Sequence, residues 1–277
     1  MASNLIGGRE KWGRGWKHCE AFTAEAAKLG IGGRPHFYPT TAQVHREGLE
    51  YRFHIGKIPV FDGTDFALIA GDCLFDARAA LDYLVFQLHL RRFKGRVPPG
   101  IEGRTAFPIL TVPPPQRARR GKRTSDTRTW QEIRCLNFRQ RRASQVLQPY
   151  NGRNDKFFYV RDQLATLARL NNIDKHRHLH VVRTVVTSVA KPSFAHEYGF
   201  RLTPSWVPLE SHAEVFRWTF TSIPPNLAEQ MNMNSDVTAE ISLYEGGSYT
   251  TLAPLLEGVL NAVGTVLSRF EVFARAH

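Results

Sequence analysis

The pattern of apolar and polar residues predicts helices in the middle of the chain with strands on both sides of them. Apolar residues recur at helical spacing in five stretches, and the expected helices cover residues 8–29, 66–92, 129–147, 157–180 and 252–276. Apolar and polar residues alternate elsewhere, and the expected strands cover residues 36–41, 49–58, 181–190, 198–202, 213–222 and 237–244. This order favours an α+β fold, with a central antiparallel helical bundle flanked by antiparallel strands from the N- and C-terminal parts.

One domain is expected to contain the whole chain, residues 1–277. Its parts are an N-terminal helix with a strand pair (8–58), a helical core (66–180), and C-terminal strands with a last helix (181–276). A basic, proline-rich insertion (94–128) interrupts the core, where Pro113, Pro114 and Pro115 stand before the run QRARRGKRTSDTR. A stretch of this composition cannot form a packed core and is expected to project as a loop.

Positive charge is concentrated around this insertion. The chain has 37 Lys and Arg against 25 Asp and Glu, a net charge of +12. Residues 94–142 hold thirteen of these cations and three acidic residues, a net charge of +10. Such a loop favours binding to phosphate backbones through counterion release, and the candidate binding residues are Arg117, Arg119, Arg120, Lys122 and Arg123. The alternative is a solvated insertion that serves only solubility.

Several function classes lack support in the sequence. The chain has no run of about 20 apolar residues and no secretory leader, so we expect a cytoplasmic protein without a membrane partner. Cys19, Cys73 and Cys135 are far apart, which predicts buried thiols rather than a disulfide framework or a cysteine zinc site. The motifs of P-loop, serine-hydrolase and zincin enzymes do not occur. No cofactor and no metal site is expected, because no spacing fixes a geometry for metal ligands.

The expected helix 66–92 is apolar around most of its circumference but has charged residues near its middle. At 100° per residue, Asp72, Asp76 and Tyr83 fall in one narrow column. Arg78 and Asp82 form an i,i+4 pair in another column. Because burying an unpaired charge is costly, we expect polar or charged groups on another element to pair with these residues.

The segment LARLNNIDKHRHLH, residues 167–180, offers such groups. Asn171, Asp174 and His178 project within the apolar face of its helix, whereas His176 points elsewhere. We expect the Arg78 guanidinium to pair with Asp174 or with Asp82. Two interpretations stay open, namely a buried cluster that fixes the register of the helices and a catalytic centre.

Two stretches of the chain resemble a widespread family of bacterial proteins without an assigned activity. They are GDCLFDARAALDYLVFQL at residues 71–88 and LARLNNIDKHRHLH, with the sequence FPI at residues 107–109 between them. Members of the family have GD, two residues and HNLRSALDHL, and later LNNIDKHR. The first motif is also similar to the signature of HEPN domains, in which His follows Arg after a few residues. HEPN domains are helical bundles that often dimerise and act as metal-independent ribonucleases in toxins and phage defence.

The resemblance implies a catalytic role for the polar residues of the two helices. Arg78 would hold the scissile phosphate, and Asp82 and Asp174 would orient it. Tyr83 stands where the family has its histidine, and tyrosine is a poor base at neutral pH. Proton transfer would therefore involve His176, His178 or Tyr83. The supporting residues would be Asp72, Asp76 and Asn171.

The expected function is RNA binding, or RNA cleavage by metal-independent transesterification, in a protein related to toxins or phage defence. The resemblance also allows a homodimer. The main alternative is a non-catalytic protein that associates with nucleic acid or ribonucleoprotein. A further alternative is an enzyme that acts on a small anionic molecule, with the basic loop as its lid.

Overall fold

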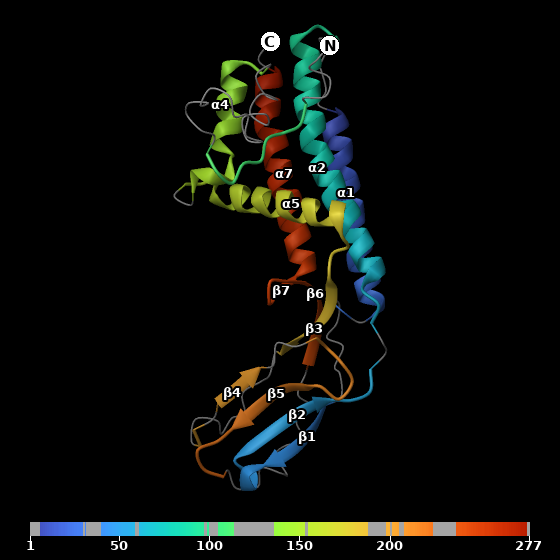
Figure 1. Cartoon of the computed structure of the whole chain (residues 1–277), viewed down its shortest axis with the longest axis vertical. Helices are drawn as coiled ribbons and strands as arrows, with labels where there is room; N and C mark the ends of the chain where they lie inside the picture. Colours follow the sequence, from blue (N-terminus) through green and yellow to red (C-terminus); the bar gives the residue numbers. More distant parts are fainter. Residues whose placement is uncertain are drawn as a thin grey trace. The chain divides into compact units, whose positions relative to one another are not determined.

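The chain forms two compact units in the computed structural model (Figure 1). The helical unit comprises Met1–Glu20, Leu68–Leu179 and Pro254–His277, and the strand unit comprises Ala21–Ala67 and His180–Ala253. The sequence predicts that both units belong to a single domain. The structure describes residues 6–29, 31, 40–58, 61–96, 99, 105–113, 136–152, 155–187, 198–199, 201–204, 208–223 and 237–275.

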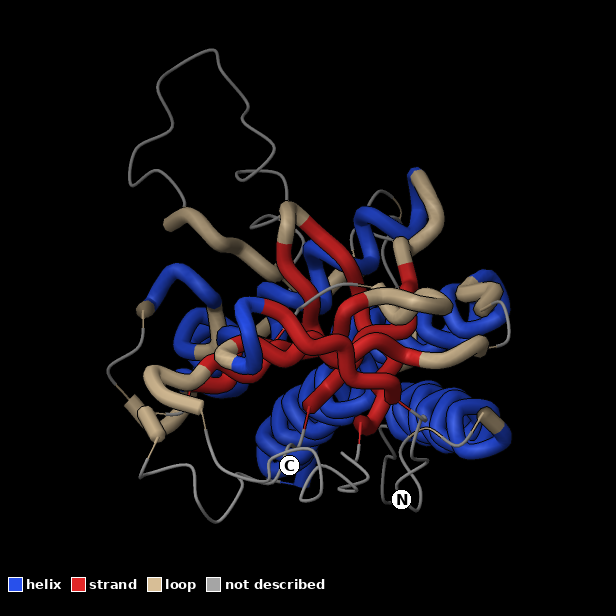
Figure 2. The backbone as a smooth tube through the Cα atoms, turned by 90° about the horizontal axis from the view of Figure 1, so that it is seen from below, coloured by secondary structure: helices blue, strands red, loops and turns tan. Residues whose placement is uncertain are grey.

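The predicted α+β class is confirmed (Figure 2). The helices are α1 (Ile6–Lys28), α2 (Thr64–Arg92), α4 (Phe138–Val146), α5 (Phe158–His176) and α7 (Leu252–Arg275), with short 3₁₀ turns at Arg46–Gly48 and Pro149–Asn151. The strands are β1 (Thr40–His45), β2 (Glu50–Ile55), β3 (Val181–Thr187), β4 (Arg201–Pro204), β5 (Glu214–Thr219), β6 (Val237–Glu245) and β7 (Ser248–Thr251). Within these described ranges, no helix combines the length and the apolar character needed to cross a membrane.

Helix α1 packs antiparallel to both α2 and α7 in the helical unit. A Cβ atom on Gly8 would lie 3.1 Å from the backbone oxygen of Ala80 in α2 and 3.3 Å from Leu267 in α7. One turn further along α1, the indole nitrogen of Trp12 donates a hydrogen bond to the backbone oxygen of Leu260 at 2.8 Å. Glycine at position 8 therefore allows the three helices to approach closely.

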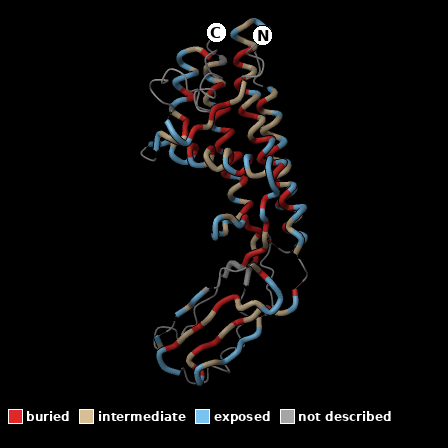
Figure 3. Tube along the Cα trace, in the orientation of Figure 1, coloured by how far each residue is buried: buried red, intermediate tan, exposed pale blue. Residues whose placement is uncertain are grey.

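Helix α2 is buried around most of its circumference, as its sequence predicts (Figure 3). Leu74, Leu81 and Leu84 have no exposed surface, and Leu260 and Val263 of α7 are equally buried. The sequence analysis placed the first and last helices outside the helical core. The first helix as far as Glu20 and the last helix from Pro254 belong to the helical unit instead, because a helix that is apolar on nearly all sides needs more than one neighbour to cover it.

Helix α5 ends four residues earlier than predicted. Its residues Leu164, Leu167 and Leu170 are buried, which confirms the predicted apolar face. Arg177 then takes an extended conformation with φ of −165°, and its backbone N–H still donates to the oxygen of Ile173 at 2.8 Å. The predicted helix 129–147 is observed only as α4, and its residues 129–135 lie outside the described part of the chain.

Two antiparallel sheets make up the strand unit, with strand orders β1-β2-β5-β4 and β3-β6-β7. The predicted pairing of the two N-terminal strands is confirmed, with Thr40 opposite Ile55. Phe53 of β2 stacks on Phe216 of β5 with ring centroids 4.2 Å apart, and Trp218 is buried beside them. These aromatic rings form core, so they are not available to stack on bases.

Three strands differ from the prediction. Strand β4 covers Arg201–Pro204 rather than residues 198–202, since residues 198 and 199 form a turn. Strand β1 covers Thr40–His45 rather than residues 36–41, because the hairpin turn at Arg46–Gly48, with positive φ at all three residues, fixes where the pair begins. Residues 36–39 lie outside the described part of the chain. Strand β7 was not predicted, although Gly246 and Gly247 before it, both with positive φ, form the two-residue turn typical of hairpins.

Candidate functional site

Arg78 and Asp82 of α2 form the predicted ion pair and hold the backbone of Phe107. The guanidinium lies 2.9 Å from an Asp82 carboxylate oxygen and donates to the backbone oxygen of Phe107 at 2.7 Å. Asp82 in turn accepts from the backbone N–H of Phe107 at 2.8 Å. The backbone N–H and C=O groups of Phe107 are thus both hydrogen-bonded to the Arg78–Asp82 pair.

The surroundings of this pair are only partly open to solvent. The side chains of Arg78 and Asp82 are 19% and 36% exposed. Burial raises the pKa of Asp82, although the charge of Arg78 and the bond from Phe107 act in the opposite direction. The Nε and Nη2 groups of Arg78 are therefore bonded within the chain, to Asp82 and to the backbone of Phe107.

The segment that Arg78 anchors is also held from its other side. Gln148, just after α4, is fully buried and donates to the backbone oxygen of Pro108 at 2.9 Å. Its amide oxygen accepts from the backbone N–H of Leu110, also at 2.9 Å. The FPI segment thus links α2 to the residues just after α4.

Asp174 does not lie beside Arg78 but against Gly71, so the predicted alternative pairing of Arg78 with Asp174 is wrong. A Cβ atom on Gly71 would be 2.6 Å from an Asp174 carboxylate oxygen. Gly71 precedes Arg78 by about two helical turns, or roughly 10 Å along the axis. Helices α2 and α5 therefore meet, as expected, but at the GD dipeptide rather than at the arginine.

Asp76 and Tyr83 face α1, which separates them from the Arg78 pair. Asp76 is buried and lies 3.2 Å from Lys11, 3.4 Å from Arg14 and 3.4 Å from His18. The ring of Tyr83 packs against Gly7, where a Cβ atom would be 2.8 Å away. Since five residues turn a helix by about 140°, an arginine and a tyrosine at this spacing point to different neighbours. The predicted catalytic residues are therefore distributed over three places.

The remaining candidates lie near the C-terminal end of α5. Asn171 is buried, whereas His176 and His178 are exposed. Burial and the charge of Asp72 raise the pKa of Asp174, and His178 acts in the opposite direction. His178 lies beyond the end of α5, so the predicted helix face shared by Asp174 and His178 is wrong, because Arg177 turns the chain out of the helix.

Replacement of Asp174 by asparagine is expected to stabilise the protein at neutral pH. Because the raised pKa means that the folded chain holds this proton more tightly than the unfolded chain does, stability is lost as the pH rises through the ordinary carboxyl range toward the raised pKa. Asparagine keeps the shape beside Gly71 but does not ionise. Urea unfolding of both proteins at neutral pH and below the ordinary carboxyl pKa measures the difference, which should disappear at the acidic end. A less stable asparagine variant at neutral pH would show instead that the carboxylate has a favourable partner.

Helix α4 carries a basic surface that the sequence analysis did not single out. Phe138 is 69% exposed, and Arg139, Arg141 and Arg142 are exposed beside it. Residues i, i+3 and i+4 share one side of a helix, so Phe138, Arg141 and Arg142 lie together. The opposite side is buried through Ala143. We call these four residues, Phe138 and the three arginines, the α4 surface.

The start of α4 is fixed by a capping box. The side chain of Asn137 accepts from the backbone N–H of Gln140 at 2.9 Å, and the side chain of Gln140 accepts from the backbone N–H of Asn137 at 3.0 Å. The pattern Asn-x-x-Gln at residues 137–140 was the available sequence signal for this helix start. The cap holds Phe138 and the arginines on an ordered turn.

The predicted phosphate-binding residues of the insertion, Arg117, Arg119, Arg120, Lys122 and Arg123, lie outside the described residues. Among the residues that are described, no group of three or more His, Cys, Asp or Glu side chains is arranged to hold a metal ion. Cys19 and Cys73 are buried free thiols, and burial raises the pKa of Cys19 to about 11. Cys135 also lies outside the described part of the chain.

Comparisons of the chain with models of protein families, with curated proteins and with solved structures found no match.

Proposed function

We propose that the protein binds single-stranded nucleic acid, with RNA as the favoured partner, and that it does so without cleaving it. The observation that carries this proposal is the α4 surface, where an exposed phenyl ring stands among three exposed arginines on a capped helix. Arginine binds phosphate oxygens with its planar fork, and an aromatic ring stacks on an unpaired base. The five candidate cations of the insertion, at residues 117–123, precede this helix in sequence.

The binding-only form of the proposal is supported by the positions of the residues that the resemblance made catalytic. Arg78 uses its donors on Asp82 and on the backbone of Phe107. Tyr83 packs against Gly7 of α1. A scissile phosphate bound through Nε and Nη2 of Arg78 would have to displace Asp82 and the backbone oxygen of Phe107. The non-catalytic alternative of the sequence analysis is therefore the better supported of the two.

The experiment measures fluorescence anisotropy of a labelled oligouridine of about 20 nucleotides, which exceeds the ~4–16 nucleotides covered by one small binding fold. A variant with Arg139, Arg141 and Arg142 changed to alanine is expected to bind about tenfold more weakly. Its salt dependence, plotted as log affinity against log salt, should be shallower by about 2 units, because roughly 0.7 units are lost per phosphate contact to a single strand. Phe138→Ala should weaken binding to the single strand but leave binding to duplex RNA unchanged.

The matched control removes three exposed cations from elsewhere, with Lys17, Lys57 and Arg201 changed to alanine. It should keep most of the affinity. Equal losses in the two triple variants would show only a response to net charge and would contradict the proposal. Tighter binding of a deoxythymidine oligomer than of oligouridine would contradict RNA as the partner. Cleavage of RNA in EDTA that disappears in Arg78→Ala would contradict the binding-only form.

A further inference from the structure

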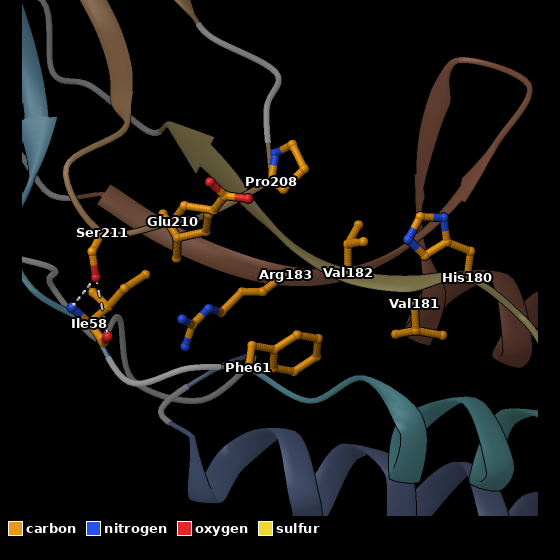
Figure 4. A pocket seen from close by; sticks show the side chains of 10 residues that line it. Ile58, Phe61, His180, Val181, Val182, Arg183, Pro208, Glu210 and Ser211 are labelled. Atoms are coloured by element: carbon orange, nitrogen blue, oxygen red, sulfur yellow. Dashed lines mark hydrogen bonds between the residues drawn. The ribbon is translucent and has the colours of Figure 1, made fainter.

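A pocket of about 430 Å³ lies in the strand unit and contains none of the candidate site residues considered so far (Figure 4). It runs along the edge of β3 that faces away from β6. At this edge the backbone oxygen of Arg183 accepts from the backbone N–H of Leu209 at 2.7 Å. The volume falls within the range of about 300–1,000 Å³ that is usual for small-molecule sites. The described lining residues come from three parts of the chain, namely residues 58 and 61, residues 180–183 and residues 208–211.

The lining combines one buried cation with apolar walls. The Arg183 residue is 5% exposed, and its guanidinium carbon lies 5.6 Å from the centre of the Phe61 ring. Ile58, Val181 and Leu209 are buried apolar residues of the same lining. A guanidinium over an aromatic face is attracted to the ring. Its planar set of N–H donors is then held in an orientation that suits a carboxylate.

Glu210 is the only carboxylate among the ten described residues of the lining, and it is exposed. Its charge is therefore screened by solvent more than that of Arg183. The carboxylate nevertheless opposes the entry of a strongly charged anion such as a phosphate dianion. The pocket is thus suited to a ligand with a single negative charge and an apolar remainder.

Backbone contacts hold the walls in place before any ligand binds. The hydroxyl of Ser211 accepts from the N–H of Ile58 at 3.0 Å and donates to the oxygen of the same residue at 3.3 Å. An isolated bridge joins Thr184 of β3 to Pro208. A preformed site of this kind loses little free energy in ordering when a ligand enters.

We propose that this pocket binds a small carboxylic acid with an apolar body. The carboxylate meets the Arg183 guanidinium in a two-pronged contact, and the body lies against Phe61 and Leu209. This activity is separate from the nucleic-acid binding of the α4 surface, and neither depends on the other. It gives the strand unit a ligand of its own.

The test compares naphthoate with the neutral naphthamide by ligand-observed NMR on the full-length protein. The two probes have the same shape, so a preference for naphthoate reports the charge of the site. Arg183→Met is expected to weaken naphthoate binding about tenfold, the size of change that follows from loss of one charge-assisted contact. Arg201→Met, an exposed arginine on β4, is the control and should leave binding unchanged.

A second variant keeps the test decisive if Arg183→Met does not fold. Glu210→Gln changes an exposed residue, and it should strengthen the binding of naphthoate by about two- to threefold without affecting naphthamide, because a repulsive charge is removed. Equal binding of the acid and the amide to the wild-type protein would overturn the proposal. Displacement of naphthoate by inorganic phosphate at lower concentration, or weaker naphthoate binding in Glu210→Gln, would overturn it as well.

Discussion

Arg78→Ala is expected to lower the free energy of unfolding of the helical unit by about 2–3 kcal/mol, since one charge-assisted hydrogen bond contributes about 1.5–3 kcal/mol. The change removes the bond to the backbone of Phe107 and leaves the half-buried carboxylate of Asp82 without its cation. We expect a smaller loss of unfolding free energy than for a fully buried ion pair, because Asp82 is 36% exposed and its charge is partly screened by water. Urea unfolding followed by circular dichroism at the helix band measures it. Faster amide exchange in residues 105–113 should accompany the loss.

Arg139→Ala is the matched control for this experiment, because Arg139 is exposed on α4. It should change stability by less than about 0.5 kcal/mol, as most surface substitutions do, yet it should weaken binding to oligouridine. Arg78→Ala should show the opposite combination. An Arg78→Ala protein of unchanged stability with reduced RNA affinity would restore the view that Arg78 faces a ligand.

Gly63→Ala is expected to cost the strand unit about 2–3 kcal/mol, at the upper end of what overpacking usually costs. A Cβ atom on Gly63 would overlap the backbone oxygen of Val181, closer than real Cβ atoms come. Because the atoms that the Cβ would meet belong to the backbone of Val181, no rotation of a side chain can relieve the overlap. Either the chain before α2 or strand β3 has to move. Thermal unfolding, together with amide exchange across residues 181–187, measures the effect.

Gly13→Ala in α1 provides the comparison, since no atom lies within 4 Å of a Cβ atom at that position. Alanine there should stabilise the protein by up to about 1 kcal/mol through helix propensity alone. A Gly63→Ala protein as stable as the wild type would mean that β3 shifts at little cost. In that case the walls of the pocket beside Val181 would not be rigid.

The elements that the sequence predicts well are those whose signal lies in their own residues. Helix α2 was placed within two residues at its start, because its apolar residues cover nearly every direction and Arg92 is followed by a basic, glycine-containing turn. The strand pair β1–β2 was predicted, but the position of β1 was not. That strand is polar and exposed, so its limits depend on the turn at Arg46–Gly48 rather than on a hydrophobic pattern.

The candidate site was harder to predict. Helical periodicity gives the direction in which a side chain points, but it does not give the position along the helix at which a second helix makes contact. The spacing correctly paired Arg78 with Asp82 and grouped Asp76 with Tyr83 on one side. It could not show that α5 reaches α2 at Gly71. A glycine inside a long apolar helix was the available clue, since glycine in a helix interior costs about 1 kcal/mol and usually marks a close approach.

No sequence pattern predicts the pocket of the strand unit. Arg183 is the one charged residue of β3, whose other residues are valines and threonines, and this is the local signal. Its neighbours Phe61 and Leu209 come from segments more than a hundred residues apart. Only the pairing of distant segments brings these residues together, and no local pattern contains that information.

The two-sided attachment of the FPI segment has a further consequence for the stretch of chain that follows it. Leu110 is bonded to Gln148, and Leu136, directly before α4, is buried, so both flanks of residues 114–135 are fixed to the helical unit. The cations at 117–123 are therefore joined by the chain to two fixed points, of which one, Leu136, lies two residues before the start of α4. For a polyanion already held by α4, contact with them is an intramolecular step, and its effective concentration can reach the order of millimolar. The two groups of cations would then multiply each other's affinity for long strands, while an oligonucleotide that reaches only one of them would gain nothing from the other.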